Sequence, residues 1–359
     1  MNNNSRFSAF CRLGKILHSL NQTDNQILGF EFTSKELLAE ENLKFEMQKS
    51  IAANPWFTEN SVKKAIAGIA EMLEESSMNA WKEYYKFPVE SIPKKVAVIM
   101  AGNIPAVGFH DFACVLLSGH KIIVKLSSND QFLLPAIANV LVAIDPEFLQ
   151  LFEFSSGKLS GFDAVIATGS GNSLRYFEFY FGKYPHIIRS NRNSIAILKG
   201  DETIEELELL ANDVFTYFGL GCRNVTHIFV PSNYNFHQML EVFANKTELM
   251  YHSKYFNNYE YNKALFLINS VKHFDNGTLL LTEESAINSP VSVLNYSYYD
   301  DIEELKKYLE LEKDKIQCVV AKNEIMKGSV EFGQSQSPSV ADYADGTDTM
   351  DFLLGLNNL

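Results

Sequence analysis

One cysteine, Cys222, stands on a short glycine-rich turn between an expected helix and an expected strand. The residues before it repeat apolar side chains at steps of three and four, and Thr203 with Glu206 has the spacing of a capping box. Glycines beside a thiol let the backbone approach a ligand, and the neighbouring Arg223 favours the thiolate. The pattern is consistent with a nucleophile, although a single cysteine in such a chain is more often buried and inert.

Two polar residues follow strands of an expected α/β region. Asn103 lies in a turn after a strand at 95–100, and Lys125 ends the next strand, shortly before Ser127. Doubly wound sheets bind ligands at the carboxyl ends of their strands. The Asn103 amide is therefore a candidate donor to an oxyanion, or a turn-forming asparagine. Lys125 is a candidate partner of a cofactor hydroxyl or phosphate, or a solvated lysine.

A glycine-rich turn, Gly169-Ser170-Gly171, leads from a strand into a helix. Backbone N–H groups at a helix start favour phosphate. Leu174 replaces the third glycine of the dinucleotide fingerprint, so this motif by itself is weak evidence. Four basic residues follow, and they supply local positive charge unless they are merely scattered over helix surfaces: Arg175, Lys183, Arg189 and Arg192.

The composition is that of a soluble globular protein with two or three lobes. The chain has 359 residues, of which 21% are charged, and a formal net charge of −13. Such an acidic chain is not expected to bind nucleic acid, which requires a basic surface. Its four scattered cysteines predict neither a metal site nor a disulfide framework. Because we find no leader-like segment and no apolar run of about 18 residues, we expect a cytoplasmic protein without a transmembrane segment.

Alternating strands and helices predict an α/β fold with mostly parallel sheets in two lobes. We expect helices at 34–53, from 58 or 60 past 72, at 107–117 and at 133–143. We expect strands at 95–100, 121–126, 163–168, 194–198, 226–230, 263–267, 292–294 and 316–321. Four parts follow: a helical segment at 1–90 on the cofactor lobe, a nucleotide-binding lobe at 91–200, a catalytic lobe at 201–325, and a tail at 326–359. The tail is expected to pack back on the protein or to lie at a subunit interface.

Taken in order, these segments resemble the aldehyde dehydrogenase superfamily. Residues 96–105 are similar to its strand that ends in asparagine, an apolar residue and proline, and 119–127 to its glycine-to-lysine-to-serine strand. Gly169 and Ser170 match its helix start, 219–222 its nucleophile turn, and 289–291 its late proline-valine step. The resemblance implies a Rossmann-like cofactor lobe and a catalytic lobe.

At two positions the sequence departs from the superfamily pattern, and these departures limit the reactions that are expected. Arg189 or its neighbours stand where hydrolytic members have the glutamate that activates water, and Ala286 stands where a glutamate grips the cofactor ribose. Without a general base, a thioester on Cys222 would not be hydrolysed efficiently. Residues 176–185, 189–194 and 338–350 are similar to the fatty acyl-CoA reductases of bacterial bioluminescence systems.

The resemblance implies an enzyme that reduces an acyl-CoA, expected to be long-chain, to an aldehyde. The reaction would proceed through an acyl-enzyme on Cys222, with Asn103 as oxyanion donor. No metal is expected to take part. It assigns Gly102, Lys125, Ser127, Gly169 and Ser170 to the cofactor, NADPH or NADH, and makes Arg189, Arg192 and Arg223 candidates for CoA phosphates. Two alternatives stay open: a reductase of an acyl phosphate or small acyl donor, and a non-catalytic nucleotide-binding relative. We expect a homodimer.

Overall fold

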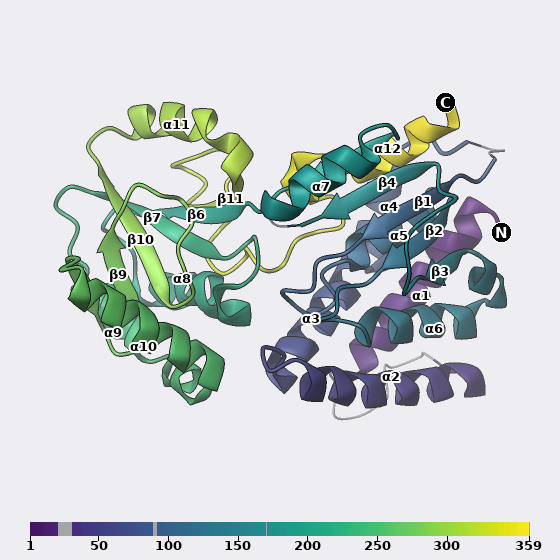
Figure 1. Ribbon diagram of the computed structural model, residues 1–359, viewed down its shortest axis with the longest axis horizontal. Helices are drawn as coiled ribbons and strands as arrows, with labels where there is room; N and C mark the ends of the chain where they lie inside the picture. Colours follow the sequence, from purple (N-terminus) through teal and green to yellow (C-terminus); the bar gives the residue numbers. More distant parts are fainter. Residues whose placement is uncertain (21–30, 89–91, 170, 359) are drawn as a thin grey trace. The chain divides into compact units, whose positions relative to one another are not determined.

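The computed structural model describes residues 1–20, 31–88, 92–169 and 171–358 (Figure 1). The chain divides into two compact units: residues 1–190 with 338–359 form the first, and 191–337 form the second. The first boundary lies before the expected position at 200, because the strand at 193–197 belongs to the second sheet. The predicted mixed α/β fold with mostly parallel sheets is confirmed.

The first unit is built on a five-stranded sheet with the order β3-β2-β1-β4-β5, in which every neighbouring pair is parallel. Its strands are β1 (Lys95–Ile99), β2 (Lys121–Lys125), β3 (Phe152–Phe154), β4 (Ala164–Thr168) and β5 (His186–Arg189). The order of the strands reverses between β1 and β4. The carboxyl ends of these two strands therefore border the crevice in which doubly wound sheets bind ligands.

Helices cover both faces of the first sheet (Figure 1). The helices of this unit are α1 (Asn3–Ser19), α2 (Ser34–Ala53), α3 (Glu59–Met72), α4 (Glu75–Glu83), α5 (Phe109–Leu117), α6 (Leu133–Ile144), α7 (Gly171–Phe181) and α12 (Thr349–Gly355). Side chains of α1, α5 and α6 share one core with the inward residues of the sheet. On the opposite face, Phe177 and Phe181 of α7 pack against Ala97 and Val165. The predicted helix at 34–53 is confirmed.

The second unit contains a six-stranded sheet with the order β11-β6-β7-β10-β9-β8, in which only the β8–β9 pair is antiparallel. Its strands are β6 (Asn193–Ile197), β7 (Val225–Pro231), β8 (His273–Asp275), β9 (Leu280–Glu283), β10 (Val293–Tyr299) and β11 (Ile316–Val320). Its helices are α8 (Ile204–Phe215), α9 (His237–Ala244), α10 (Ser253–Ile268) and α11 (Ile302–Leu311). Figure 1 shows α11 over one face of this sheet and α8, α9 and α10 over the other.

The strand expected at 263–267 is wrong, because these residues lie inside α10. The buried side chains of α10 are Tyr255, Tyr259 and Asn262, which recur at steps of four and three. They define an inward helical stripe that precedes the apolar run, and Leu267 in that run is exposed. The short apolar segment was mistaken for a strand because the buried residues of this helix are two tyrosines and an asparagine, which do not form an aliphatic helical pattern.

The tail from 338 onward is fastened by side chains of α4 and of the segment that follows it. The indole N–H of Trp81 donates to the Tyr343 hydroxyl at 2.8 Å, and the Tyr85 hydroxyl donates to Asp348 at 2.7 Å. Met350 of α12 is fully buried in the same core as α1 and α5. Among the described helices, none is long and apolar enough to cross a membrane.

His227 on β7 is a fully buried histidine. Its Nδ1 lies 3.0 Å from the carbonyl oxygen of Ala286, and its Nε2 has no hydrogen-bond partner among the described residues. Burial lowers the pKa of His227 from 6.5 to about 4. The unfolded chain therefore takes up a proton near pH 6.5 that the folded chain does not take up until about pH 4, so stability falls across this window as the pH drops.

We expect His227→Asn to remove this pH dependence, because an asparagine amide can still donate to Ala286 but does not titrate. The wild type should lose up to about 3 kcal/mol of unfolding free energy relative to the variant between about pH 6.5 and pH 4. Urea unfolding of the full chain at several pH values measures this. His237→Asn, at an exposed histidine of α9, is the matched control and should keep the wild-type profile. If the unfolding free energy of His227→Asn depended on pH as that of the wild type does, His227 would not be the source of the pH dependence.

Candidate functional site

Cys222 follows a strained turn at the end of α8. The helix stops at Phe215, and a 3₁₀ stretch follows in which Tyr217, Phe218 and Gly219 have left-handed φ angles of 54°, 59° and 77°. Bulky residues rarely adopt this conformation, and it is found at functional sites. The Phe218 ring stacks on the His252 imidazole with ring centroids 4.1 Å apart. Cys222 is half-buried.

Asn224 ties this turn to the end of α8. Its side-chain amide donates to the carbonyl oxygens of Asp213 at 3.0 Å and Thr216 at 2.8 Å, and its side-chain oxygen accepts the N–H of Gly221 at 2.8 Å. Asn224 is fully buried. These bonds occupy carbonyl groups that a helix end leaves unpaired. The residue was missed in the sequence, where an asparagine two places after the cysteine carries no recognisable signal.

Ser194 at the start of β6 holds the cysteine backbone from another direction. Its hydroxyl lies 3.1 Å from the carbonyl oxygen of Cys222 and donates to it. The same hydroxyl oxygen accepts the backbone N–H of Cys318 at 3.2 Å, with the Cys318 sulfur 3.0 Å away. Ser194 is fully buried. The turn is thus connected to β6 and β11, and a second thiol lies near the nucleophile candidate without a disulfide.

The two arginines of the second unit that were predicted to bind substrate are both engaged with backbone carbonyls. Arg223 donates through Nε to Ser335 at 2.5 Å. Arg192 donates to Lys313 at 3.3 Å. Each side chain therefore fixes a loop of this unit, whatever else it binds.

In the first unit, Gly102 and Asn103 follow β1, and Gly169 follows β4, so all three lie at the strand reversal. A Cβ on Gly102 would lie 2.6 Å from Ser127, and one on Gly169 would lie 2.7 Å from the Phe177 ring. Both positions exclude a larger residue, because Ser127 and Phe177 already fill the space that a side chain would need. Asn103 is exposed. The predicted cofactor residue Ser170 lies outside the described residues.

Lys125 ends β2 at the same edge of the sheet. Its ammonium donates to the carbonyl oxygens of Ser156 at 2.8 Å and Gly157 at 3.0 Å. An ammonium has three N–H groups, so these bonds leave one for a ligand. Lys125 is consequently positioned by the loop after β3 and is not a freely solvated lysine.

Arg189 does not lie where a substrate phosphate could reach it, which corrects the expectation made from the sequence. The side chain is 3% exposed, and it donates to the Asp111 carboxylate at 2.6 Å and to the Thr349 hydroxyl at 2.7 Å. Burial by itself would lower the pKa of Arg189, but the Asp111 charge outweighs burial and raises it. Arg189 is therefore half of a buried ion pair that also holds the start of α12.

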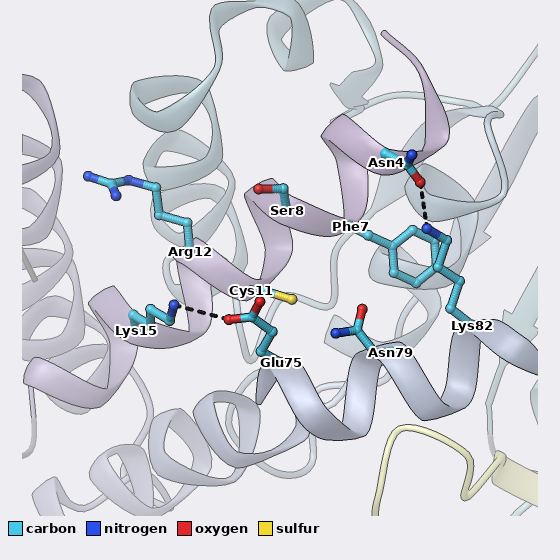
Figure 2. Close-up of a pocket in the computed structure, with 9 residues that line it drawn as sticks. All are labelled: Asn4, Phe7, Ser8, Cys11, Arg12, Lys15, Glu75, Asn79 and Lys82. Atoms are coloured by element: carbon cyan, nitrogen blue, oxygen red, sulfur yellow. Dashed lines mark hydrogen bonds and ion pairs between the residues drawn. The ribbon is translucent and has the colours of Figure 1, made fainter.

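A cavity of about 370 Å³ lies between α1 and α4, away from the predicted residues (Figure 2). Lys15 and Glu75 form an ion pair across it at 3.3 Å, and Lys82 donates to Asn4 at 2.6 Å. Because no predicted site residue lines this cavity, we do not assign it to the candidate site.

We expect Arg189→Met to lower the free energy of unfolding by about 3–5 kcal/mol, because it leaves the Asp111 carboxylate buried without its partner. Replacing both residues, as in Arg189→Met with Asp111→Leu, should recover most of this loss. Denaturant unfolding of the three proteins provides the comparison. If Arg189→Met were as stable as the wild type but bound substrate more weakly, Arg189 would be a substrate-binding residue and not half of a buried ion pair.

We expect Gly102→Ala to lower the free energy of unfolding by about 1–3 kcal/mol, because the new Cβ collides with Ser127. Gly157→Ala is the matched control, since no atom lies within 4 Å of a Cβ built there. Denaturant unfolding measures both variants. If Gly102→Ala and Gly157→Ala were equally stable, the turn at Gly102 would not be in close contact with Ser127.

Comparisons with known proteins identify the family and the fold of the chain. The model of the family "Acyl-CoA reductase (LuxC)" matches residues 9–254. The long-chain acyl-protein thioester reductase 2 of Photobacterium leiognathi is 23% identical over 185 residues, which is 46% of this chain and 39% of that protein. The match thus spans well under two thirds of the relative.

Two solved structures show the same fold at low sequence identity. The NAD⁺ complex of an aldehyde dehydrogenase from Bacillus cereus has a TM-score of 0.65 and 12% identity, covering 96% of this chain and 82% of that one. Aldehyde dehydrogenase 21 of Physcomitrella patens, in complex with the reaction product succinate, has a TM-score of 0.60 and 13% identity, covering 99% and 84%. The fold is therefore that of the aldehyde dehydrogenases, and since the family model matches more than half of its length, the chain belongs to the acyl-CoA reductase (LuxC) family.

Proposed function

We propose that this protein reduces an acyl-CoA thioester, expected to be long-chain, to an aldehyde with NADPH or NADH, through an acyl-enzyme on Cys222. The observation that carries the proposal is the half-buried Cys222 on a turn held by Asn224 and Ser194. It occurs in a chain that belongs to the acyl-CoA reductase family. A rigid, partly exposed thiol is what a covalent mechanism requires.

In the first step, the Cys222 thiolate attacks the thioester carbonyl carbon. A carbon–sulfur bond forms to Cys222, the bond to the CoA sulfur breaks, and CoA leaves as a thiolate that takes up a proton. We assign the oxyanion to two donors, the Asn103 amide and the backbone N–H of Cys222. One such donor typically contributes about 3–4 kcal/mol.

The second step is reduction of the acyl-enzyme, for which a nicotinamide cofactor bound by the first unit would supply the hydride. The fit of the first unit to a nucleotide is supported by position, because the turns after β1 and β4 lie at the strand reversal, where doubly wound sheets bind ligands. We assign Gly169 and Ser170 to the phosphates, Lys125 to a ribose hydroxyl, and Ser127 with Gly102 to the floor of this site. Collapse of the second tetrahedral species breaks the bond to Cys222 and releases the aldehyde.

The Arg189–Asp111 pair supports release of an aldehyde rather than an acid. Hydrolysis of the acyl-enzyme would need a base that activates water. By the resemblance, Arg189 or its neighbours take the place of the glutamate that activates water in hydrolytic members, and Arg189 is a buried cation bound to Asp111 at 2.6 Å. The acyl-enzyme would therefore persist until hydride arrives.

A second carrier of the acyl group is favoured by two observations. The curated relative is named as a reductase of long-chain acyl-protein thioesters. In addition, Arg189 is buried against Asp111 and is not available to a CoA phosphate. A thioester on a protein cysteine would require no phosphate site.

The experiment is intact-protein mass spectrometry after mixing with long-chain acyl-CoA in the absence of reduced cofactor. We expect one acyl adduct on the wild type and none on Cys222→Ala. Cys318→Ala is the matched control, because it removes the second half-buried thiol of the same unit and should still be acylated. Adding NADPH or NADH should then discharge the adduct and identify the cofactor.

The other outcomes separate the alternatives. An adduct formed only from an acylated carrier protein would replace CoA by a protein thioester. Acylation by acyl phosphate alone would indicate a reductase of small acyl donors. No adduct from any donor, together with nucleotide binding, would indicate a non-catalytic relative and overturn the proposal.

A further inference from the structure

Asp130, in the loop between β2 and α6, is a buried carboxylate with an incomplete set of partners. It is 7% exposed. One side-chain oxygen, Oδ2, accepts the backbone N–H of Ala106 at 2.7 Å. The other, Oδ1, is buried and makes no hydrogen bond of good geometry among the described residues, although the backbone N–H of Leu133 also stabilises the carboxylate. Burying a carboxylate in this way is costly unless it fulfils a task.

The group that Asp130 holds is itself strained. Ala106 has a φ of 52°, a left-handed conformation that alanine rarely adopts. It lies in the turn after β1, at the strand reversal, and is 6% exposed. Such strain persists only where the surroundings fix it, and the Asp130 contact is one such constraint.

The same two loops also touch at Gly102. A Cβ there would lie 2.6 Å from Ser127 and 3.3 Å from the backbone nitrogen of Asp130. The loop of Asp130 is fastened from a third side, because the Asn54 amide donates to the carbonyl oxygen of Asn129 at 3.0 Å. The turn from Gly102 to Ala106 is thus held at both of its ends by one anchored loop.

Asn103 lies between these two fixed points. We propose that Asp130 is a positioning residue: by holding Ala106, its carboxylate fixes the turn that carries Asn103 and so places the oxyanion donor. This inference rests on the proposed function, in which Asn103 binds the oxyanion. Asp130 itself touches neither substrate nor cofactor in this role.

The charge state of Asp130 gives the proposal a signature in pH. Burial raises its pKa to about 6, opposed by the backbone N–H groups of Ala106 and of Leu133 at the start of α6. Among the described residues no charged side chain contributes to this shift, and Asn54, which reaches the same loop, is neutral. Above about pH 6 the carboxylate is the stronger acceptor for Ala106, and below it the neutral acid holds the turn less firmly.

The test is a double-mutant cycle on the single-turnover rate of Cys222 acylation by acyl-CoA. Asn103→Ala should slow acylation about 100-fold or more. Asp130→Ala should slow it about 10-fold or more. If Asp130 acts through Asn103, the double variant should be no slower than Asn103→Ala alone. Losses that multiply, or an Asp130→Ala protein that acylates at the wild-type rate, would overturn the inference.

Asp130→Asn keeps the shape and the acceptor oxygen of the side chain, so it is expected to fold even if Asp130→Ala does not. Because asparagine does not titrate, this variant also tests the pH dependence. The ratio of its acylation rate to that of the wild type should rise as the pH falls through about 6, since the thiolate content of Cys222 cancels in the ratio. Glu153→Gln, at an exposed carboxylate on β3, should give a ratio independent of pH. A flat ratio for Asp130→Asn would count against the proposal.

Different results would overturn the proposed function and the role of Asp130. A wild type that is not acylated by any thioester would overturn the proposed function and this inference with it. An acylated wild type with multiplying losses in the cycle would overturn the role of Asp130 alone and leave the acyl-enzyme intact.

Discussion

The candidate site depends first on the side chain of Asn224. Its amide pairs with carbonyl groups at the end of α8 and with the N–H of Gly221, so a single buried residue joins the helix to the cysteine turn. The left-handed Tyr217 and Phe218 each cost about 1–3 kcal/mol. Several buried hydrogen bonds of about 1 kcal/mol each are of the right size to hold them. Without this connection the turn would relax, and Cys222 would lose its fixed direction.

Parallel pairing explains why candidates far apart in the sequence meet at one edge of the first unit. In the register of the sheet, Ile99 lies opposite both Lys125 and Ala167, and Thr168 lies opposite Arg189. The turns that follow these strands are neighbours for the same reason. The topology therefore brings the proposed cofactor residues to one edge of the sheet, and the glycines let Ser127 and Phe177 pack against the turns that carry them.

Many of the helices and strands were predictable from the sequence, because caps and apolar repeats are encoded by neighbouring residues. The capping box at Thr203 and Glu206 is present, and the apolar strand at 316–321 lies within one residue of β11. Long-range pairing is not encoded locally. No periodicity reveals that Arg189 meets Asp111 across the fold, or that Asn224 reaches back to α8. The strand expected within α10 failed because its inward stripe is aromatic and polar rather than aliphatic.

The buried Arg189 links the architecture to the proposed chemistry. A base that activates water needs solvent access and a free carboxylate, whereas here the end of β5 carries a cation that is neutralised by Asp111 and also bound to Thr349 of the returning tail. The resemblance implies that Arg189 or its neighbours replace the glutamate of hydrolytic members, and Arg189 itself fastens the last helix through Thr349. Restoring a glutamate there would bury an acid beside Asp111, and two close carboxylates without a cation repel each other. A hydrolytic variant would therefore have to give up the contact that holds α12.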